Sequence, residues 1–352
     1  MSAGAIVVAV LAFALLVVIH EAGHFVAARL SGMRVERFSV GFGPILLRAR
    51  RGETEYALSA LPLGGYVKIA GMAPGEDVAP GDRASYSNQP AWRRFAVIAA
   101  GPLMNYLLAV AIATALAATA GFPVRDEAAR VGEVLPGSPA AQAGLRDGDR
   151  ILFVAGQPVA SWNDLVAAIQ ANPGREVPLA VERGEGAAAE RVDLALVPRD
   201  DGGVGRAGFR PHLLRERRPF GAGALALGVQ RTHAAAAANL SALGQVFSRR
   251  PGAPELSGPL GIGQELARAA HAGGEALLGI LWNISLALAL LNLLPIPGLD
   301  GGRLVFLAYE MVARRPVNQR VESIVHAVGI VALLALILAV TVFGDLARML
   351  GR

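Results

Sequence analysis

The chain has 352 residues, and its composition is that of a membrane protein rather than a soluble one. Apolar residues make up 53% of it, only 17% are charged and the mean hydropathy is positive, whereas about 25% of an average soluble domain is charged. The net charge of +5 is modest, and the basic residues gather in short loops beside apolar runs, which excludes a basic nucleic-acid-binding face. The lack of cysteine excludes disulfides, thiolate zinc sites and a cysteine nucleophile.

Four apolar stretches, at 5–30, 95–120, 276–294 and 325–343, approach the roughly 20 residues that a helix needs to cross a bilayer. Arginine and lysine are concentrated between the first two stretches and between the last two, and no positive charge precedes the first stretch. By the positive-inside rule, these two loops are cytoplasmic, and both termini and the long segment 122–272 are outside.

The first cytoplasmic loop, about 35–75, is predicted to contain β-structure. Residues 34–40 and 55–69 alternate enough to be strands, and the glycines between and within them are expected to form turns. These glycines are Gly41, Gly43, Gly64 and Gly65. We expect a hairpin sheet against or slightly within the membrane, with its edges paired.

The external segment begins with a predicted α+β domain at 122–212. Strands are expected at 131–135, 150–154, 177–182 and 191–197, and a helix at 161–171. Residues 213–272 are expected to form extracytoplasmic surface helices. For the alanine-rich stretch 221–247 the alternative is a fifth span, which the polar residues around Gln230 to His233 disfavour.

The segment His20-Glu-Ala-Gly-His24 in the first span matches the H-E-x-x-H pattern. Residues four apart share one face of a helix, so both imidazoles can bind one zinc ion. Glu21 can accept a proton from a water molecule and deliver it to a leaving amine. Polar groups are costly at membrane depth, which favours a functional site over polar side chains that merely pack.

A catalytic zinc site needs a third protein ligand, and Asp300 is the candidate. It ends the run Asn-Leu-Leu-Pro-Ile-Pro-Gly-Leu-Asp, whose prolines must unwind the third span. Unwound backbone at membrane depth is tolerated only where it lines a cavity or packs against protein. The loop charges place His20, His24 and Asp300 at the same depth near the cytoplasmic face. We therefore predict one zinc ion per chain, bound by these three residues.

These motifs, with AGPLMN at 100–105, resemble those of the site-2 protease family of intramembrane zinc metalloproteases. The resemblance is greatest to the bacterial branch typified by the sigma-E-regulating protease, and it covers nearly the whole chain. Further matching segments are GFGP at 41–44, LPLGGYVK at 61–68 and SGPLGI at 257–262.

The resemblance implies zinc binding by His20, His24 and Asp300, catalysis by Glu21 and a membrane-reentrant β-loop at about 35–75. It also implies that Asn292 handles the substrate backbone. Further substrate-binding positions in the matching motifs are Pro295, Pro297, Gly64 and Gly65. Members of the family cleave transmembrane segments of single-span proteins, commonly anti-sigma factors, and some clear signal-peptide remnants. We therefore expect such proteins and the lipid bilayer as partners, and no nucleic acid.

The external domain, with GSPAAQAGL at 137–145 followed by DGD, resembles a circularly permuted bacterial PDZ domain. Such folds bind chain ends by strand addition and hold the terminal carboxylate with backbone amides. By this resemblance, Gly205, Gly208 and Phe209 belong to the peptide-binding loop. The sigma-E type has two such domains in tandem, and this chain departs from it in having one.

The prediction is thus a polytopic α-helical membrane protein in the bacterial cytoplasmic (inner) membrane. It has four transmembrane helices, a membrane-associated β-loop and one extracytoplasmic PDZ (α+β) domain. Its parts are 1–121 with the first two spans, 122–212, 213–272, and 273–352 with the last two spans.

Other functions fit the sequence less well. A serine-type intramembrane protease would need G-x-S-G and an aspartyl type G-x-G-D, and neither is present. A non-catalytic scaffold has no reason to keep Glu21 beside the ligands, and a metal transporter would be expected to carry polar residues in several spans. The other histidines, His212, His233, His271 and His326, are expected at a surface or interface. Glu310 is expected to form an ion pair with a nearby arginine.

Overall fold

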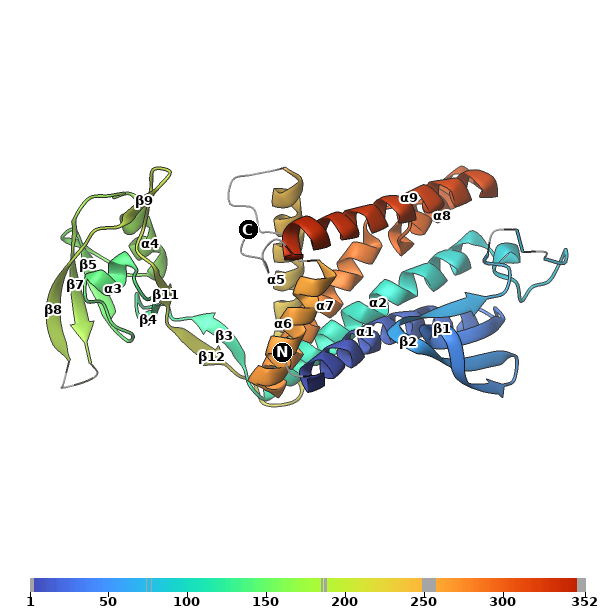
Figure 1. Ribbon diagram of the computed structural model, residues 1–352, viewed down its shortest axis with the longest axis horizontal. Helices are drawn as coiled ribbons and strands as arrows, with labels where there is room; N and C mark the ends of the chain where they lie inside the picture. Colours follow the sequence, from blue (N-terminus) through green and yellow to red (C-terminus); the bar gives the residue numbers. More distant parts are fainter. Residues whose placement is uncertain are drawn as a thin grey trace. The chain divides into compact units, whose positions relative to one another are not determined.

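A computed structural model of the chain describes residues 3–73, 75–76, 78–184, 186, 189–248 and 258–346. The chain divides into two compact units (Figure 1). Unit 1 comprises Met1–Thr119 and Arg218–Arg352, and unit 2 comprises Ala120–Arg217. Unit 2 is therefore an insertion between the second and third predicted spans.

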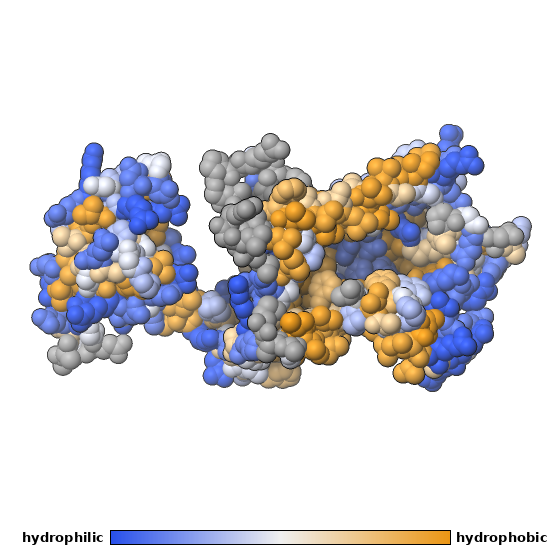
Figure 2. Space-filling model, in the orientation of Figure 1, coloured by the Kyte–Doolittle hydropathy of each residue, from blue (hydrophilic) through white to orange (hydrophobic). Residues whose placement is uncertain are grey.

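Unit 1 contains the four predicted spans, and the described residues confirm them as helices. Those long and apolar enough to cross a membrane are Ile6–Leu30, Ala91–Ala118, Gly274–Leu293 and Gln319–Leu346. They correspond to α1 (Ala3–Leu30), α2 (Ala91–Ala118), α7 (Gly274–Leu293) and α9 (Gln319–Ala339) with a π-helical extension, Val340–Leu346. None of the residues of α9 is buried, and its surface is strongly apolar (Figure 2). This is the pattern of a helix that faces lipid.

Three further helices complete unit 1: α5 (Ala222–Phe247), α6 (Pro259–Ala272) and α8 (Asp300–Ala313). Helix α5 packs along α2, where Gly228 lies directly against the backbone of Thr114. About two turns away along α2, the Tyr106 hydroxyl lies 2.6 Å from the His233 Nε2 atom of α5. The stretch predicted as a surface helix is thus a helix packed on a span, and it is not among the four candidate spans.

The β-loop consists of two long strands, β1 (Val35–Arg51) and β2 (Thr54–Ile69). The prediction that β1 ends before Gly41 is wrong. Gly41 and Gly43 lie inside the strand with φ of +87° and +84°, at positions where the pairing register shifts. Such bulges bend a strand without ending it. As a result, the first part of β1 pairs with both ends of β2, so that Phe38 lies opposite both Val67 and Tyr56.

An apolar cluster joins α1, the sheet, α2 and α8. Its buried members are Ala28, Met33, Val35, Ile69, Tyr86, Val97, Ile98, Leu304 and Leu307. Leu304 and Leu307 follow Asp300 by one and two turns, so their burial holds the start of α8 against α1 and α2. Tyr86 belongs to a short 3-10 turn, Tyr86–Asn88, and burial raises the pKa of its hydroxyl to about 12.

Arg94 connects this cluster to α8. Its guanidinium lies 5.9 Å from the centre of the Tyr86 ring and forms an ion pair with Glu310. Both charged side chains are largely buried, with 17% and 19% of their surface exposed. The ion pair predicted for Glu310 is confirmed, and it links α2 to α8.

Unit 2 is a small α+β domain. Its strands are β3 (Phe122–Arg125), β4 (Val131–Val134), β5 (Arg150–Val154), β6 (Gln157–Pro158), β7 (Val177–Arg183), β8 (Glu190–Leu196), β9 (Arg199–Asp201), β10 (Val204–Arg206), β11 (Phe209–Pro211) and β12 (Leu213–Glu216). The main sheet has the order β6-β5-β7-β8 and is antiparallel. Two short helices, α3 (Pro139–Gln142) and α4 (Trp162–Gln170), accompany it. The predicted strands correspond to β4, β5, β7 and β8, and the predicted helix to α4.

The start of α4 follows from its sequence. Ser161 and Asp164 form a capping box, in which each side chain accepts a hydrogen bond from the backbone N–H of the other residue. The helix then buries Leu165 and Ile169 in the core of the unit. Asp149 accepts a hydrogen bond from the Arg146 N–H and also pairs with Arg183 at 2.8 Å.

Replacement of Glu310 by alanine is expected to destabilise unit 1, because it leaves the Arg94 guanidinium largely buried and without its carboxylate. We expect a loss of about 1–3 kcal/mol, seen as a lower midpoint of thermal unfolding in detergent. The matched control is Glu265→Ala, which removes the exposed Arg268–Glu265 pair and should change stability by less than about 1 kcal/mol. Equal effects of the two substitutions would contradict the structural role of Glu310.

Candidate metal centre

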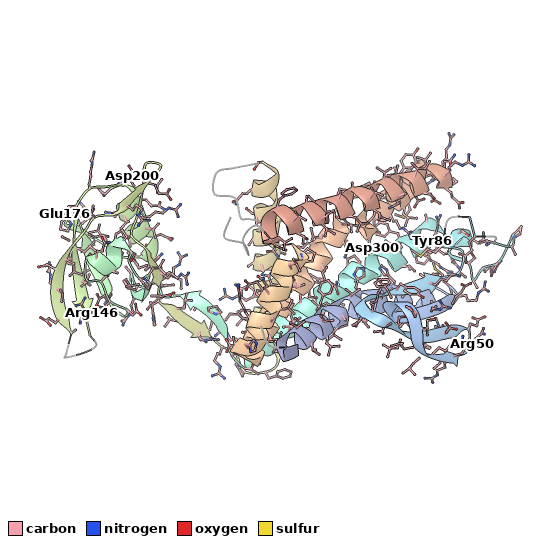
Figure 3. The ribbon with its side chains drawn as sticks, in the orientation of Figure 1. Arg50, Tyr86, Arg146, Glu176, Asp200 and Asp300 are labelled. Carbon is pink, nitrogen blue, oxygen red and sulfur yellow. The ribbon has the colours of Figure 1, made fainter. Side chains whose placement is uncertain are left out.

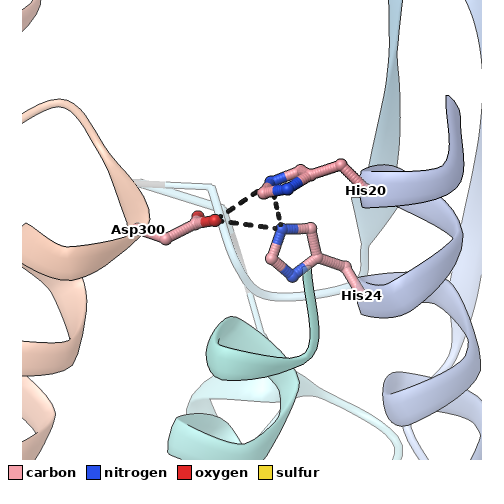
Figure 4. A group of neighbouring side chains, drawn as sticks. All are labelled: His20, His24 and Asp300. Atoms are coloured by element: carbon pink, nitrogen blue, oxygen red, sulfur yellow. Dashed lines mark hydrogen bonds and ion pairs between the residues drawn. The ribbon is translucent and has the colours of Figure 1, made fainter. Parts of the chain in front are cut away.

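His20 and His24 lie on consecutive turns of α1 and face the first residue of α8. Figure 3 shows Asp300 among the helices of unit 1, and Figure 4 shows the three side chains pointing at one another. The Asp300 Oδ2 atom lies 3.0 Å from His20 Nε2 and 3.3 Å from His24 Nε2. The two Nε2 atoms are 3.2 Å apart.

This triangle has the dimensions of a zinc site. Ligands bound at 2.0–2.1 Å in tetrahedral geometry lie about 3.3 Å from one another. In the described part of the chain, these three residues form the group that could hold a metal ion. Asp300 Oδ2 is buried, and apart from the two imidazole nitrogens it has no hydrogen-bond partner among the described residues. The residues present therefore fit a zinc ion with three protein ligands.

Two glycines let α1 and α2 approach closely enough to form the site. A Cβ atom at Gly23 would overlap the Ala100 carbonyl of α2. A Cβ atom at Gly101 would overlap His24 Nε2 and lie 2.8 Å from His20 Nε2. Sequence reasoning found the motif that contains Gly101 but assigned it no role. The structure places this residue directly against the imidazoles of His20 and His24.

Helix α2 also contacts the far side of each imidazole. The His24 Nδ1 atom lies 2.8 Å from the Val97 carbonyl oxygen. Because a carbonyl only accepts hydrogen bonds, His24 must donate from Nδ1, which leaves the Nε2 lone pair directed at the centre. The His20 Nδ1 atom lies 3.4 Å from Nδ2 of Asn105.

The unwound segment before Asp300 folds back on the start of α8. Helix α7 ends at Leu293 and α8 begins at Asp300, where the two prolines predicted an interruption. A Cβ atom at Gly301 would overlap the Leu294 carbonyl, and one at Gly302 would lie 2.6 Å from the Ile296 oxygen. The glycine pair after Asp300 therefore lets the segment pack on the first turn of α8.

Helix α9 holds the same segment from the other side. The Gly298 N–H donates a hydrogen bond of 3.0 Å to Nδ1 of His326. Gly329, one turn further along α9, packs against the Pro297 carbonyl, which a Cβ atom would overlap. We expected His326 at a surface or interface and assigned it no contact with the site. A histidine in an apolar span was the available sequence signal.

Glu21 lies beside the centre and is held by the sheet. Its Oε2 atom accepts a hydrogen bond of 3.1 Å from the Val67 N–H of β2. The same strand brings Gly64 to α1, where a Cβ atom would lie 3.3 Å from Val17. Gly65 instead packs against the Ser39 carbonyl of β1.

The other predicted substrate-binding residues lie in the part of the chain just before Asp300. Asn292 is half-buried in the last turn of α7. Pro295 and Pro297 lie in the unwound segment, the first exposed and the second half-buried. They belong to the segment that carries Asp300, but the compact triangle does not include them.

The predicted peptide-binding residues lie in unit 2. Gly205 packs against the Ile169 carbonyl at the end of α4, and Gly208 packs against Ser138. The Phe209 ring contacts Trp162, with ring centres 5.5 Å apart.

The remaining matching motif, SGPLGI, begins with Ser257, which lies outside the described residues. Its other residues, from Gly258 to Ile262, begin α6. There the Asp345 carboxylate accepts hydrogen bonds of 3.0 Å and 2.9 Å from the N–H groups of Gly258 and Gly261.

Comparison with known proteins gives consistent similarities over nearly the whole chain. Residues 8–336 match the model of peptidase family M50. The chain is 31% identical to a putative zinc metalloprotease of Neisseria meningitidis, over 97% of this chain and 98% of the relative. It is 34% identical to a putative zinc metalloprotease of Rhizobium meliloti, over 94% and 92%. It is 28% identical to the regulator of sigma-W protease RasP of Bacillus subtilis, over 97% of each chain.

Replacement of Gly101 by alanine is expected to abolish zinc binding, because the added methyl group would occupy the space of the His24 imidazole. Zinc per chain, measured on the protein purified in detergent, should fall well below that of the wild type. The control is Gly279→Ala in α7, where a Cβ atom would meet nothing within 4 Å. Undiminished zinc binding by a folded Gly101→Ala variant would show that the ions bind elsewhere.

Proposed function

Because the chain belongs to peptidase family M50, the site-2 proteases, and is a zinc metalloprotease, we propose that it cleaves peptide bonds within transmembrane segments of single-span membrane proteins. In this proposal His20, His24 and Asp300 hold the zinc ion and Glu21 is the catalytic acid and base. We propose two classes of substrate, anti-sigma factors and the remnants of cleaved signal peptides.

One observation carries the proposal. The three ligand atoms converge within 3.3 Å of one another, and the two histidines lie inside a candidate membrane span. Asp300 follows another candidate span, from which the unwound segment 294–299 separates it. A catalyst at this position reaches bonds that lie in the membrane, and a single-span protein can bring such a bond to it from the lipid phase.

The chemistry requires a proton carrier beside the metal. A zinc ion in this site would supply Lewis-acid activation of water and of the scissile carbonyl. Glu21 follows a ligand directly, so its carboxylate can take the proton from the attacking water and pass it to the leaving nitrogen. The hydrogen bond from the Val67 N–H orients one oxygen of Glu21 and leaves the other for proton transfer.

Substrate binding is assigned to the two segments beside the centre. A transmembrane segment must unwind at the scissile bond, and its freed backbone groups then need partners. We assign this role to Asn292, Pro295 and Pro297 on the approach to Asp300, and to Gly64 and Gly65 in β2. The packing of Gly64 beside α1 supports the assignment of β2.

Unit 2 is assigned as a PDZ domain that binds a peptide or protein end. The segment Gly205 to Phe209 leads into β11 and lies close to α4, both through the Ile169 carbonyl and through Trp162. In strand addition, an extended peptide pairs with an exposed sheet edge and its side chains enter neighbouring pockets. The ligand class is a chain end, of a substrate or of a regulatory partner.

The membrane is assigned as the bacterial cytoplasmic membrane, with both termini and unit 2 outside and the metal centre near the cytoplasmic side. Support for a membrane-associated β-loop comes from its exposed apolar side chains. They are Phe42, Ile45, Leu46, Leu47, Leu58 and Leu61. A relative that is named a regulator of sigma-W supports anti-sigma factors as substrates.

Replacement of Glu21 by glutamine is expected to lower cleavage of a model single-span substrate by about 10²- to 10⁴-fold, because an amide cannot carry the proton. Zinc stoichiometry should be unchanged. The control is Glu53→Gln, at an exposed position in the hairpin. Cleavage by Glu21→Gln at the wild-type rate would refute the mechanism.

The proposed topology can be tested with introduced cysteines, since the chain has none of its own. In intact cells whose outer surface is accessible, a membrane-impermeant maleimide should label Glu176→Cys in unit 2. It should label Arg83→Cys, between β2 and α2, only after permeabilisation. Both residues are exposed. The reverse labelling pattern would invert the assigned orientation.

A further inference from the structure

Asn105 is a polar side chain buried in the middle of α2, with none of its surface exposed. Its Nδ2 atom lies 3.4 Å from Nδ1 of His20. Its Oδ1 atom is buried and has no hydrogen-bond partner among the described residues. A buried amide in a membrane-spanning helix is costly unless its polar atoms are used, so Asn105 calls for an explanation beyond packing.

His24 has a hydrogen-bond acceptor for its Nδ1 atom, whereas among the described residues His20 does not. On His24, the Val97 carbonyl accepts from Nδ1 at 2.8 Å, and this fixes the tautomer in which Nε2 is free for a metal. His20 also points Nε2 at Asp300, at 3.0 Å. If His20 binds zinc through Nε2, its proton must lie on Nδ1, and that N–H then needs an acceptor.

Asn105 is the side chain in place to be that acceptor. Rotation of its amide by half a turn exchanges the oxygen and the nitrogen without moving the rest of the side chain. No described donor holds Oδ1 in its other position, so nothing in the described structure opposes the exchange. Oδ1 would then lie where Nδ2 now lies, within reach of the His20 N–H.

The backbone of Asn105 is held independently of its side chain. The Ser285 hydroxyl of α7 donates a hydrogen bond of 2.8 Å to the Asn105 carbonyl. This contact fixes the position of Asn105 on α2 relative to α7, but it does not determine which way the amide faces. The two roles can therefore be separated by substitution.

We propose that Asn105 is a positioning residue of the metal centre, whose Oδ1 accepts the Nδ1 proton of zinc-bound His20 and so selects the metal-binding tautomer. The proposal rests on the zinc site of the proposed function. Val97 and Asn105, about two turns apart on α2, would then orient the two histidine ligands from one helix, the first through its backbone and the second through its side chain. Partners of this kind are worth about 10- to 100-fold in metal affinity.

The test is the zinc affinity of the full chain in detergent, measured by competition with a chelator. Asn105→Leu removes the acceptor at similar volume and should weaken zinc binding by about 10- to 100-fold. Asn105→Asp retains an acceptor oxygen, and it should bind zinc at least as tightly as the wild type. Ser285→Ala, which removes only the contact with the Asn105 backbone, is the matched control and should leave zinc affinity unchanged.

Three outcomes would overturn the proposal. Wild-type affinity in Asn105→Leu would mean that the side chain only packs. Equal losses in Asn105→Asp and Asn105→Leu would mean that Asn105 donates rather than accepts. A loss in Ser285→Ala as large as that in Asn105→Leu would mean that local packing is being measured.

The variants also separate this proposal from the proposed function. If Asn105→Leu does not fold, Asn105→Ala takes its place, and the same loss of zinc affinity is expected of it. Tight zinc binding by the wild type, together with no effect of any Asn105 substitution, refutes the role of Asn105 alone. No zinc binding by the wild type or by Glu21→Gln refutes the metal centre itself, and with it both proposals.

Discussion

The metal centre depends on the close approach of α1 and α2, because ligand atoms about 3.3 Å apart leave no room for a side chain between the two helices. Gly101 meets this requirement beside the imidazoles, and Gly23 of α1 meets it where it packs against the Ala100 carbonyl of α2. Once the helices are this close, α2 can also supply the groups that contact Nδ1 of each histidine. The same close contact therefore both makes space for the metal and orients its ligands.

The third proposed ligand, Asp300, is positioned by backbone that is not helical. Unsatisfied backbone groups cost several kcal/mol each at membrane depth, so the unwound segment before Asp300 needs partners on every side. The glycines after Asp300 let it fold back on α8, and His326 accepts the Gly298 N–H from α9. Although α9 buries none of its own residues, it contacts the segment that carries Asp300. A displacement of α9 would therefore move the segment that positions Asp300.

The sheet takes part in the site through its backbone. The Val67 N–H binds Glu21, and the neighbouring part of β2 packs against α1 at Gly64. The position of the Glu21 carboxylate is thus coupled to the strand to which we assign substrate binding. The apolar cluster with Leu304 and Leu307 ties sheet, α2 and α8 together behind this strand.

The sequence by itself determined the features that depend on local spacing. The interval of four between His20 and His24, the length of the spans and the prolines that interrupt the third span are each set by neighbouring residues. They were enough to predict four membrane helices and to name Asp300 as the partner of the two histidines. The roles of these residues remain proposals, but the structure does bring the three side chains together.

Only the tertiary structure decided which residues support them. The contacts of Gly101, Asn105 and His326 join helices that are far apart in the sequence, and their register follows no local periodicity. The glycines of β1 were misjudged for a related reason, since a positive φ is compatible with both a turn and a bulge, and the partner strand decides between them. Local spacing can therefore name the ligands, whereas the groups that orient them depend on how the helices pack.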